Sequence, residues 1–131
     1  MSSRIRLFIV EDSSAILQRL VRSISDLPGV DYVGSAEDVG PAIAGLERIQ
    51  PDALILDLQL PSGNGLDVLR AVRKSQPDMR VLVFTNFAED AYRDAAMKAG
   101  AQEFLDKNAD FPKVRDILTR WVDARAANTT H

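Results

Sequence analysis

The chain contains no cysteine, a single histidine and no long apolar segment. The lack of cysteine excludes disulfides, thiolate metal sites and cysteine nucleophiles. A membrane-spanning helix needs about 20 consecutive apolar residues, and no stretch of this sequence approaches that length. Residues 1–4 precede the first strand-like run without the apolar core of a signal peptide. These absences favour a globular domain of the cytoplasm that makes no membrane contact.

Concentrated positive charge is also missing. The net charge is -3, and no run of Lys and Arg exceeds two residues. Nucleic-acid binding needs a dense basic surface, so we expect no nucleic-acid contact from this domain itself. The length of 131 residues, with 46% hydrophobic and 27% charged residues, fits a single domain over residues 1–131. We expect an ordered core over about residues 5–125 and a frayed polar tail over residues 126–131.

Short apolar runs alternate with segments of helical spacing. The expected strands are residues 5–10, 30–35, 53–56, 81–84 and 103–105. The first, third and fourth are almost continuously apolar, as strands buried on both faces of a parallel sheet must be. The expected helices lie around residues 16–27, 43–49, 66–72, 92–99 and 114–122, and Asp38 is the expected N-cap of the second. This alternation predicts an α/β domain with a parallel sheet and right-handed crossovers.

Reactive side chains follow the predicted strands, at the sheet edge where such folds bind ligands. Glu11 and Asp12 follow the first strand, and Asp57 follows the third. Thr85 and Lys107 follow the fourth and fifth. A carboxylate at one strand end is commonly a loop residue or a helix cap, but a set at the ends of several strands indicates a site.

The chemistry of these side chains favours phosphoryl transfer. Glu11, Asp12 and Asp57 repel one another when crowded together, and a hard divalent cation such as Mg²⁺ relieves that repulsion with oxygen ligands. Asp57 is then placed to attack a phosphorus atom as a carboxylate nucleophile. Mg²⁺, Lys107 and Thr85 would hold the oxygens of the transferring group, because phosphoryl transfer depends on positioning and charge neutralisation.

The sequence resembles the receiver domains of two-component response regulators from about Ile5 to Trp121. The motifs that carry the resemblance are Ile9-Val10-Glu11-Asp12, Leu56-Asp57 with Leu60-Pro61 and Gly65, Thr85, and Gly100-Ala101 through Phe104 to Lys107. It implies a flavodoxin-like (βα)5 three-layer sandwich with a five-stranded parallel sheet of order 2-1-3-4-5.

The same resemblance implies a role for each matching residue. Asp57 is the expected phosphoacceptor, and Lys107 is expected to pair with the phosphoryl group. Asp12, Asp57 and the backbone carbonyl of Gln59 would ligate Mg²⁺, with Glu11 acting through water. Thr85 and Phe104 would form a hydroxyl–aromatic switch that alters the surface around the fourth helix and fifth strand.

Three side chains are expected to tune access to Asp57. Asn86 stands where the family usually has a smaller residue and should narrow the approach. Phe87 is expected to lay its ring over the mouth of the pocket and slow hydrolysis, although packing into the core is the alternative. The amide of Gln59 is placed to orient a water. Asn108 departs from the family in another way, because many receivers have proline after the lysine.

Competing functions fit the sequence less well. A haloacid-dehalogenase-like phosphatase needs a second aspartate two residues after the nucleophile, where this chain has Gln59. A flavin-binding flavodoxin needs a phosphate-binding loop where this chain has Glu11 and Asp12. A pseudo-receiver that only mediates contacts would not need the complete phosphorylation set.

The resemblance also implies partners. We expect a phosphoacceptor signalling domain rather than an enzyme, with a histidine kinase or histidine phosphotransfer protein as donor. The output would be a downstream protein target or a receiver homodimer. Residues 59–65 resemble receivers fused to LuxR-type DNA-binding domains, so a stand-alone receiver and a fragment of such a regulator are both open at this point.

Overall fold

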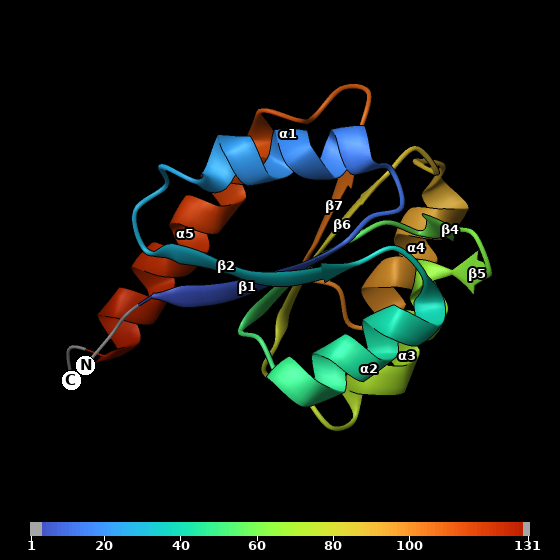
Figure 1. The fold of residues 1–131 in the computed structure, drawn as a ribbon, viewed down its shortest axis with the longest axis horizontal. Helices are drawn as coiled ribbons and strands as arrows, with labels where there is room; N and C mark the ends of the chain where they lie inside the picture. The colour runs from blue at the N-terminus through green and yellow to red at the C-terminus, as the bar shows by residue number, and fades with distance from the viewer. Residues whose placement is uncertain (1–3, 130–131) are drawn as a thin grey trace.

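The structure is a computed structural model that describes residues 4–129. Its fold is a central sheet between two layers of helices (Figure 1). The sheet is parallel and has the order β2-β1-β3-β6-β7. Its strands are β1 (Ile5–Val10), β2 (Val30–Ala36), β3 (Ala53–Leu56), β6 (Arg80–Thr85) and β7 (Glu103–Asp106). These five strands, taken in sequence order, have the expected order 2-1-3-4-5, so the predicted α/β topology is confirmed.

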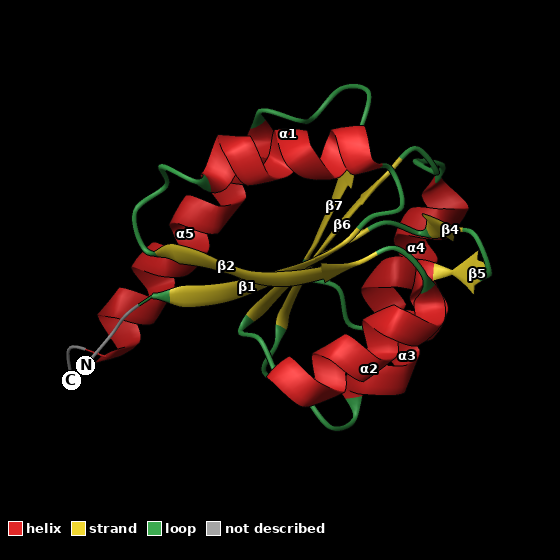
Figure 2. Cartoon of the chain, in the orientation of Figure 1, coloured by secondary structure: helices red, strands yellow, loops and turns green. Residues whose placement is uncertain are grey.

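Helices cover both faces of the sheet, as Figure 2 shows. They are α1 (Ser14–Ile24), α2 (Val39–Ile49), α3 (Gly65–Arg73), α4 (Asp90–Lys98) and α5 (Lys113–Thr129). Helices α1 and α5 pack on one face, and α2, α3 and α4 on the other. The three layers of the expected sandwich are therefore present.

The core explains why the central strands are almost entirely apolar. Every residue of β3 is buried, because its side chains alternate between the two helical layers. Leu54 and Leu56 pack towards α2 and α3, while Ala53 and Ile55 pack towards α1 and α5. This two-sided burial produces the continuous apolar run seen in the sequence.

Side-chain caps fix where three helices begin, close to the ends of the strands. Ser13 accepts a hydrogen bond from the Ile16 amide at the start of α1. Asp38 accepts one from Val39 at the start of α2, as expected. Asn64 accepts one from the Leu66 amide at the start of α3. Each cap satisfies an amide that has no partner inside its helix.

Two features differ from the sequence-based expectation. A two-stranded antiparallel hairpin, β4 (Gln59–Leu60) and β5 (Gly63–Asn64), lies between β3 and α3. Helix α5 continues to Thr129, so residues 126–129 are helical where a frayed tail was expected. Residues 130–131 of that tail lie outside the described part of the chain. Over residues 4–129, no helix is long and apolar enough to cross a membrane.

Candidate functional site

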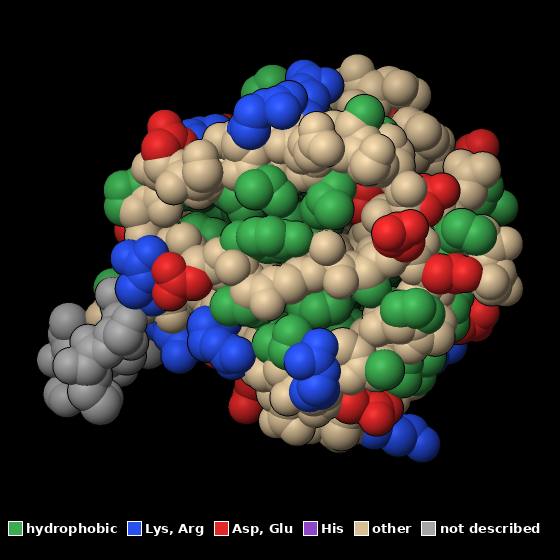
Figure 3. Space-filling model, in the orientation of Figure 1, with side chains coloured by type: hydrophobic (Ala, Val, Ile, Leu, Met, Phe, Trp, Pro, Cys, Tyr) green, Lys and Arg blue, Asp and Glu red, His purple; other side chains and the backbone are tan. Residues whose placement is uncertain are grey.

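A cleft of about 290 Å³ lies at the carboxyl ends of the strands. On the face drawn in Figure 3, acidic side chains gather at the side towards which β1 and β2 run. The residues that line the cleft are Glu11, Asp12, Ser13, Ile16, Asp57, Gln59, Leu60, Pro61, Asn86 and Lys107. Most of the predicted site residues are therefore brought together.

Asp57 lies directly after β3 and is only 3% exposed. Its amide continues the sheet ladder by donating to the Val10 carbonyl at 3.0 Å. Its side-chain Oδ1 accepts from the Gln59 amide at 3.1 Å. The first residue of α3, Gly65, packs so closely that a Cβ added to it would lie 2.1 Å from the Asp57 carbonyl oxygen. Asp57 is thus held by the strand before it and the helix after it.

The ammonium of Lys107 bridges two buried carboxylates. Lys107 Nζ lies 2.7 Å from Asp57 Oδ2 and 2.7 Å from Glu11 Oε1. Burial disfavours the ammonium charge, but the hydrogen bonds to Asp57 and Glu11 outweigh burial and raise the pKa of Lys107 above its usual value. Lys107 therefore stays charged beside the predicted nucleophile.

Glu11 is 2% exposed, and burial raises its pKa above the usual value despite the opposing bonds from Lys107 and from the Ser13 amide. The charge of Asp57 raises it further. Lys107 supplies one positive charge against three carboxylates, so the site keeps an excess of negative charge. That excess is what a cation would neutralise.

The carboxylates form a ligand set that fits a hard cation. One oxygen each from Glu11, Asp12 and Asp57 lies within 4.8 Å of the others. Asp12 is exposed, whereas Glu11 and Asp57 are buried. Oxygen donors beside an open cleft suit Mg²⁺, which keeps several waters when bound. The residues present therefore fit the expected metal.

The two expected switch residues lie beside the cleft rather than in its wall. Thr85 is fully buried, and its Oγ1 accepts a hydrogen bond from the Phe87 amide at 3.1 Å. Phe104 faces the interior with 5% of its surface exposed. The guanidinium carbon of Arg93, in α4, lies 4.7 Å from the centre of the Phe104 ring. Arg93 thus links the predicted switch aromatic to α4.

Two of the three residues expected to tune access line the cleft, and the third does not. Asn86 and Gln59 line the cleft, where both were expected. Phe87 does not belong to its wall: the ring stacks on Tyr92 at a centroid distance of 5.0 Å and packs against the core under α4. The expectation that this ring covers the mouth of the pocket is therefore not supported, because an aromatic neighbour in α4 offers it a partly buried position.

One contact between loops has no signal in the amino-acid sequence. Asp38, expected only as a helix cap, also holds the loop of the β4–β5 hairpin. Its Oδ2 accepts from the Ser62 hydroxyl at 2.5 Å, and its Oδ1 accepts from the Ser62 amide at 2.9 Å. The two residues are 24 positions apart, and no local pattern links them. This contact supports the wall of the cleft formed by Leu60 and Pro61.

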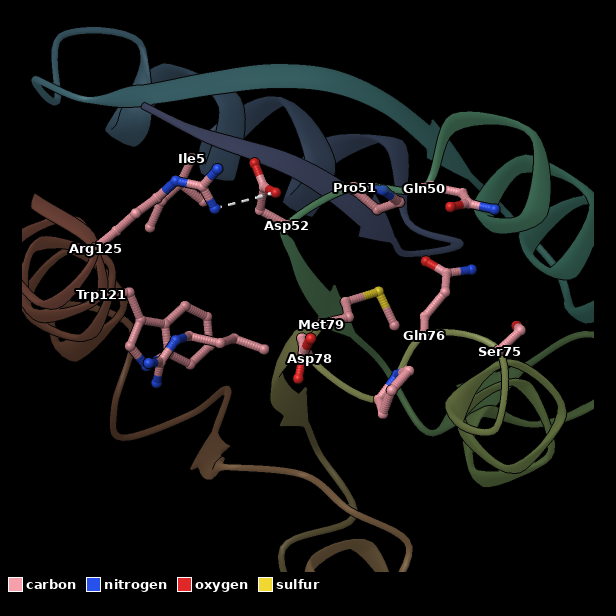
Figure 4. Close-up of a pocket in the computed structure, with 12 residues that line it drawn as sticks. Ile5, Gln50, Pro51, Asp52, Ser75, Gln76, Asp78, Met79, Trp121 and Arg125 are labelled. Atoms are coloured by element: carbon pink, nitrogen blue, oxygen red, sulfur yellow. Dashed lines mark ion pairs between the residues drawn. The ribbon is translucent and has the colours of Figure 1, made fainter. Parts of the chain in front are cut away.

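A second cavity, of about 380 Å³, lies at the opposite edge of the sheet (Figure 4). Its wall includes Trp121 and the ion pair between Arg125 and Asp52, whose atoms are 3.2 Å apart. The charged residues of its lining balance: Asp52 and Asp78 oppose Arg80 and Arg125. It lacks the crowded carboxylates that phosphoryl chemistry needs, so the cleft around Asp57 is the candidate site.

Known proteins share this sequence pattern. RegA, the photosynthetic apparatus regulatory protein of Rhodobacter capsulatus, is 33% identical over 112 residues, 86% of this chain and 60% of RegA. The DNA-binding transcriptional activator DevR/DosR of Mycobacterium tuberculosis is 33% identical over 104 residues, 79% of this chain and 48% of that protein. The chain thus spans about half to three fifths of the length of these relatives.

Solved structures agree with the fold. The response regulator domain of Thermotoga maritima CheB superposes with a TM-score of 0.80 at 26% identity, covering 93% of this chain and 96% of that domain. The profile of the response regulator receiver domain matches residues 7–119, which include the three carboxylates, Thr85 and Lys107. The chain therefore belongs to the family of response regulator receiver domains.

Proposed function

We propose that this domain accepts a phosphoryl group on Asp57 and is switched by it. The observation that carries the proposal is the contact of the Lys107 ammonium with Asp57 Oδ2, at 2.7 Å, inside a cluster of three carboxylates. A buried lysine that served only to neutralise Asp57 would not need Glu11 and Asp12 beside it. An excess of acidic side chains at an open cleft fits a site that also takes a cation and a phosphoryl group.

The transfer is a displacement at phosphorus. A carboxylate oxygen of Asp57 forms a bond to phosphorus as the bond between phosphorus and the donor atom breaks, and the leaving group keeps that electron pair. The product is an acyl phosphate on Asp57. Lys107, already fixed at Asp57 Oδ2, faces the negative charge of the incoming group. A water that attacks phosphorus later releases inorganic phosphate and restores the carboxylate.

Mg²⁺ would be held by Asp12, Asp57 and the backbone carbonyl of Gln59. Glu11 is engaged by Lys107 and by the Ser13 amide, so we expect it to act through water. When bound, the metal supplies positive charge to the phosphoryl oxygens. Asn86 stands at the cleft and limits the approach of donors and water.

Phosphorylation is expected to reach the surface through Thr85. Its hydroxyl oxygen accepts from the Phe87 amide, and after phosphorylation the hydroxyl would turn to donate to a phosphoryl oxygen. Residues 86–89 lead directly into α4, which packs beside Phe104 through Arg93. The altered surface would therefore be that of α4 and β7, available to a protein target or to a second receiver.

The proposed role is that of a phosphoacceptor in signalling, not of an enzyme acting on a separate substrate. The phosphodonor would be a histidine kinase or a histidine phosphotransfer protein. Relatives such as DevR/DosR are named as DNA-binding activators and are about twice as long as the stretch they share with this chain. They favour a DNA-binding regulator as the origin of this receiver, and the resemblance of residues 59–65 points to the LuxR type.

Uptake of a phosphoryl group tests the proposal. The protein is incubated with acetyl phosphate in Mg²⁺ or in EDTA, and its intact mass is followed. We expect one phosphoryl group per chain in Mg²⁺, little in EDTA, and none in Asp57→Asn. Asp123→Asn, which makes the same change at an exposed position of α5, should behave as the wild type. Labelling of Asp57→Asn to the wild-type extent would refute the assignment.

A further inference from the structure

The loop after β7 carries Lys107 and is closed by hydrogen bonds between its two ends. The Asp106 amide donates to Asp110 Oδ2 at 3.0 Å, and the Asp110 amide donates back to the Asp106 carbonyl at 2.8 Å. Inside this ring the Asn108 amide donates to Asp106 Oδ1 at 2.8 Å. The Lys107 amide donates to the Thr85 carbonyl at 3.0 Å. The backbone of Lys107 is therefore held on both sides.

Asp110 is the outer support of this ring. Its side chain is 19% exposed, and one of its oxygens lies 3.1 Å from Lys113 Nζ. The hydrogen bond from the Asp106 amide, followed by that from Lys113, lowers the pKa of Asp110. Asp110 is therefore an ionised acceptor at neutral pH, and such acceptors make stronger hydrogen bonds than neutral ones.

The residue after Lys107 takes part in this arrangement through its amide. Asn108 stands where many receivers have proline, and its peptide bond to Lys107 is trans. Proline has no amide hydrogen, so it could not make the bond that Asn108 donates to Asp106. In this chain, side-chain carboxylates hold the loop at the position where the proline ring would restrict it.

We propose that Asp110 is a positioning residue for phosphoryl transfer, acting through the backbone of Lys107; this inference rests on the function proposed above. The Lys107 side chain is long and flexible, so the place of its ammonium between Asp57 and Glu11 depends on a fixed backbone. Small displacements of a charge that stabilises a transition state cost rate. Loosening the ring at Asp110 should move Lys107 without touching the carboxylates.

The kinetic test uses matched variants. Asp110→Ala removes the acceptor, and Asp110→Asn keeps an oxygen that can bond to the Asp106 amide. With acetyl phosphate and Mg²⁺, we expect Asp110→Ala to be slower by about tenfold and Asp110→Asn to recover most of the rate. Asp116→Ala, at an exposed aspartate in the first turn of α5, should keep the wild-type rate. A wild-type rate in Asp110→Ala would overturn the inference.

A double variant separates positioning from general damage. Because Asp110 is proposed to act through Lys107, Asp110→Ala should slow the Lys107→Ala protein no further. An additional tenfold loss in that background would show a separate, merely structural role and would overturn the proposal.

A last measurement is independent of phosphorylation. Hydrogen exchange of the Lys107 side-chain ammonium, followed by NMR in Mg²⁺-free buffer, should become several-fold faster in Asp110→Ala and stay unchanged in Asp116→Ala. Faster exchange in a protein that accepts no phosphoryl group would uphold the positioning role and refute the proposed function. Unchanged exchange in a protein that is phosphorylated on Asp57 would refute the positioning role alone.

Discussion

Replacing Lys107 by Met should show how much the lysine charge stabilises the folded protein. In the wild type the ammonium contacts Asp57 and Glu11. The exposed fraction of the side chain is 7% for Lys107, 4% for Asp57 and 2% for Glu11. Met keeps the length of the side chain but leaves both carboxylates unpaired. Removing one partner of a buried ion pair typically costs about 3–5 kcal/mol. Because the cleft admits water to this site, we expect the lower end, a loss of about 3 kcal/mol in the free energy of unfolding.

The loss should depend on pH through Glu11. Its folded-state pKa already lies above the usual value of 4.5, because burial disfavours its charge. A group with a raised folded pKa contributes stability that is present below its unfolded pKa and is lost as the pH rises through the folded pKa. Without Lys107 that folded pKa rises further. The variant should therefore lose less stability near pH 5 than near pH 7.5, because the lower pH favours the protonated form of Glu11.

Urea denaturation at both pH values, in EDTA and in Mg²⁺, measures these effects. Mg²⁺ should restore part of the loss, because it binds the folded carboxylates and not the unfolded chain. Lys98→Met, at an exposed position in the last turn of α4, is the control and should cost about 0.5 kcal/mol or less. An equal loss of unfolding free energy in the two variants, or the same loss for Lys107→Met at both pH values, would contradict this reasoning.

Four further outcomes are expected. Asp12→Ala should weaken Mg²⁺ binding at least about tenfold by calorimetric titration, since it removes an exposed metal ligand; unchanged affinity would remove Asp12 from the metal site. Gly65→Ala should lower both the stability in urea denaturation and the phosphorylation rate, because its Cβ would lie 2.1 Å from the Asp57 carbonyl oxygen. The control Gly40→Ala has no atom within 4 Å of the new Cβ and should be neutral or stabilising. Asn86→Ala should speed labelling by acetyl phosphate, and Phe87→Ala should leave the rate of phosphoryl loss unchanged; faster loss in Phe87→Ala would return that ring to the pocket mouth.

The sheet was predictable because its strands obey a single physical demand. Strands β1, β3 and β6 are covered on both faces, so their sequences are almost continuously apolar and their ends are visible as a change to polar residues. The strand-end rule then placed Asp57, Glu11, Asp12 and Lys107 together without knowledge of their distances. Strand order came from the family resemblance, since periodicity does not specify which strands pair.

The details that were missed depend on contacts between distant parts of the chain. The β4–β5 hairpin has two-residue strands, which are too short to show alternation. Phe87 packs against the core and stacks on Tyr92, and the sequence does not show that these two rings meet. Glu11 follows the first parallel strand and Lys107 follows the last, so no local sequence pattern predicts the direct ion pair between them. The small polar residues after Arg125 suggested fraying, but alanine is a strong helix former and α5 continues through them.

Chemical mapping of the phosphorylated residue shows whether Asp57 is the phosphoacceptor. After incubation with acetyl phosphate and Mg²⁺, reduction with borohydride converts an aspartyl phosphate into homoserine, which peptide sequencing by mass spectrometry can place. We expect homoserine at position 57 and at no other aspartate, with none formed when the donor is omitted and little when Mg²⁺ is omitted. Homoserine at Asp12 or at another aspartate, with position 57 unmodified, would contradict this expectation.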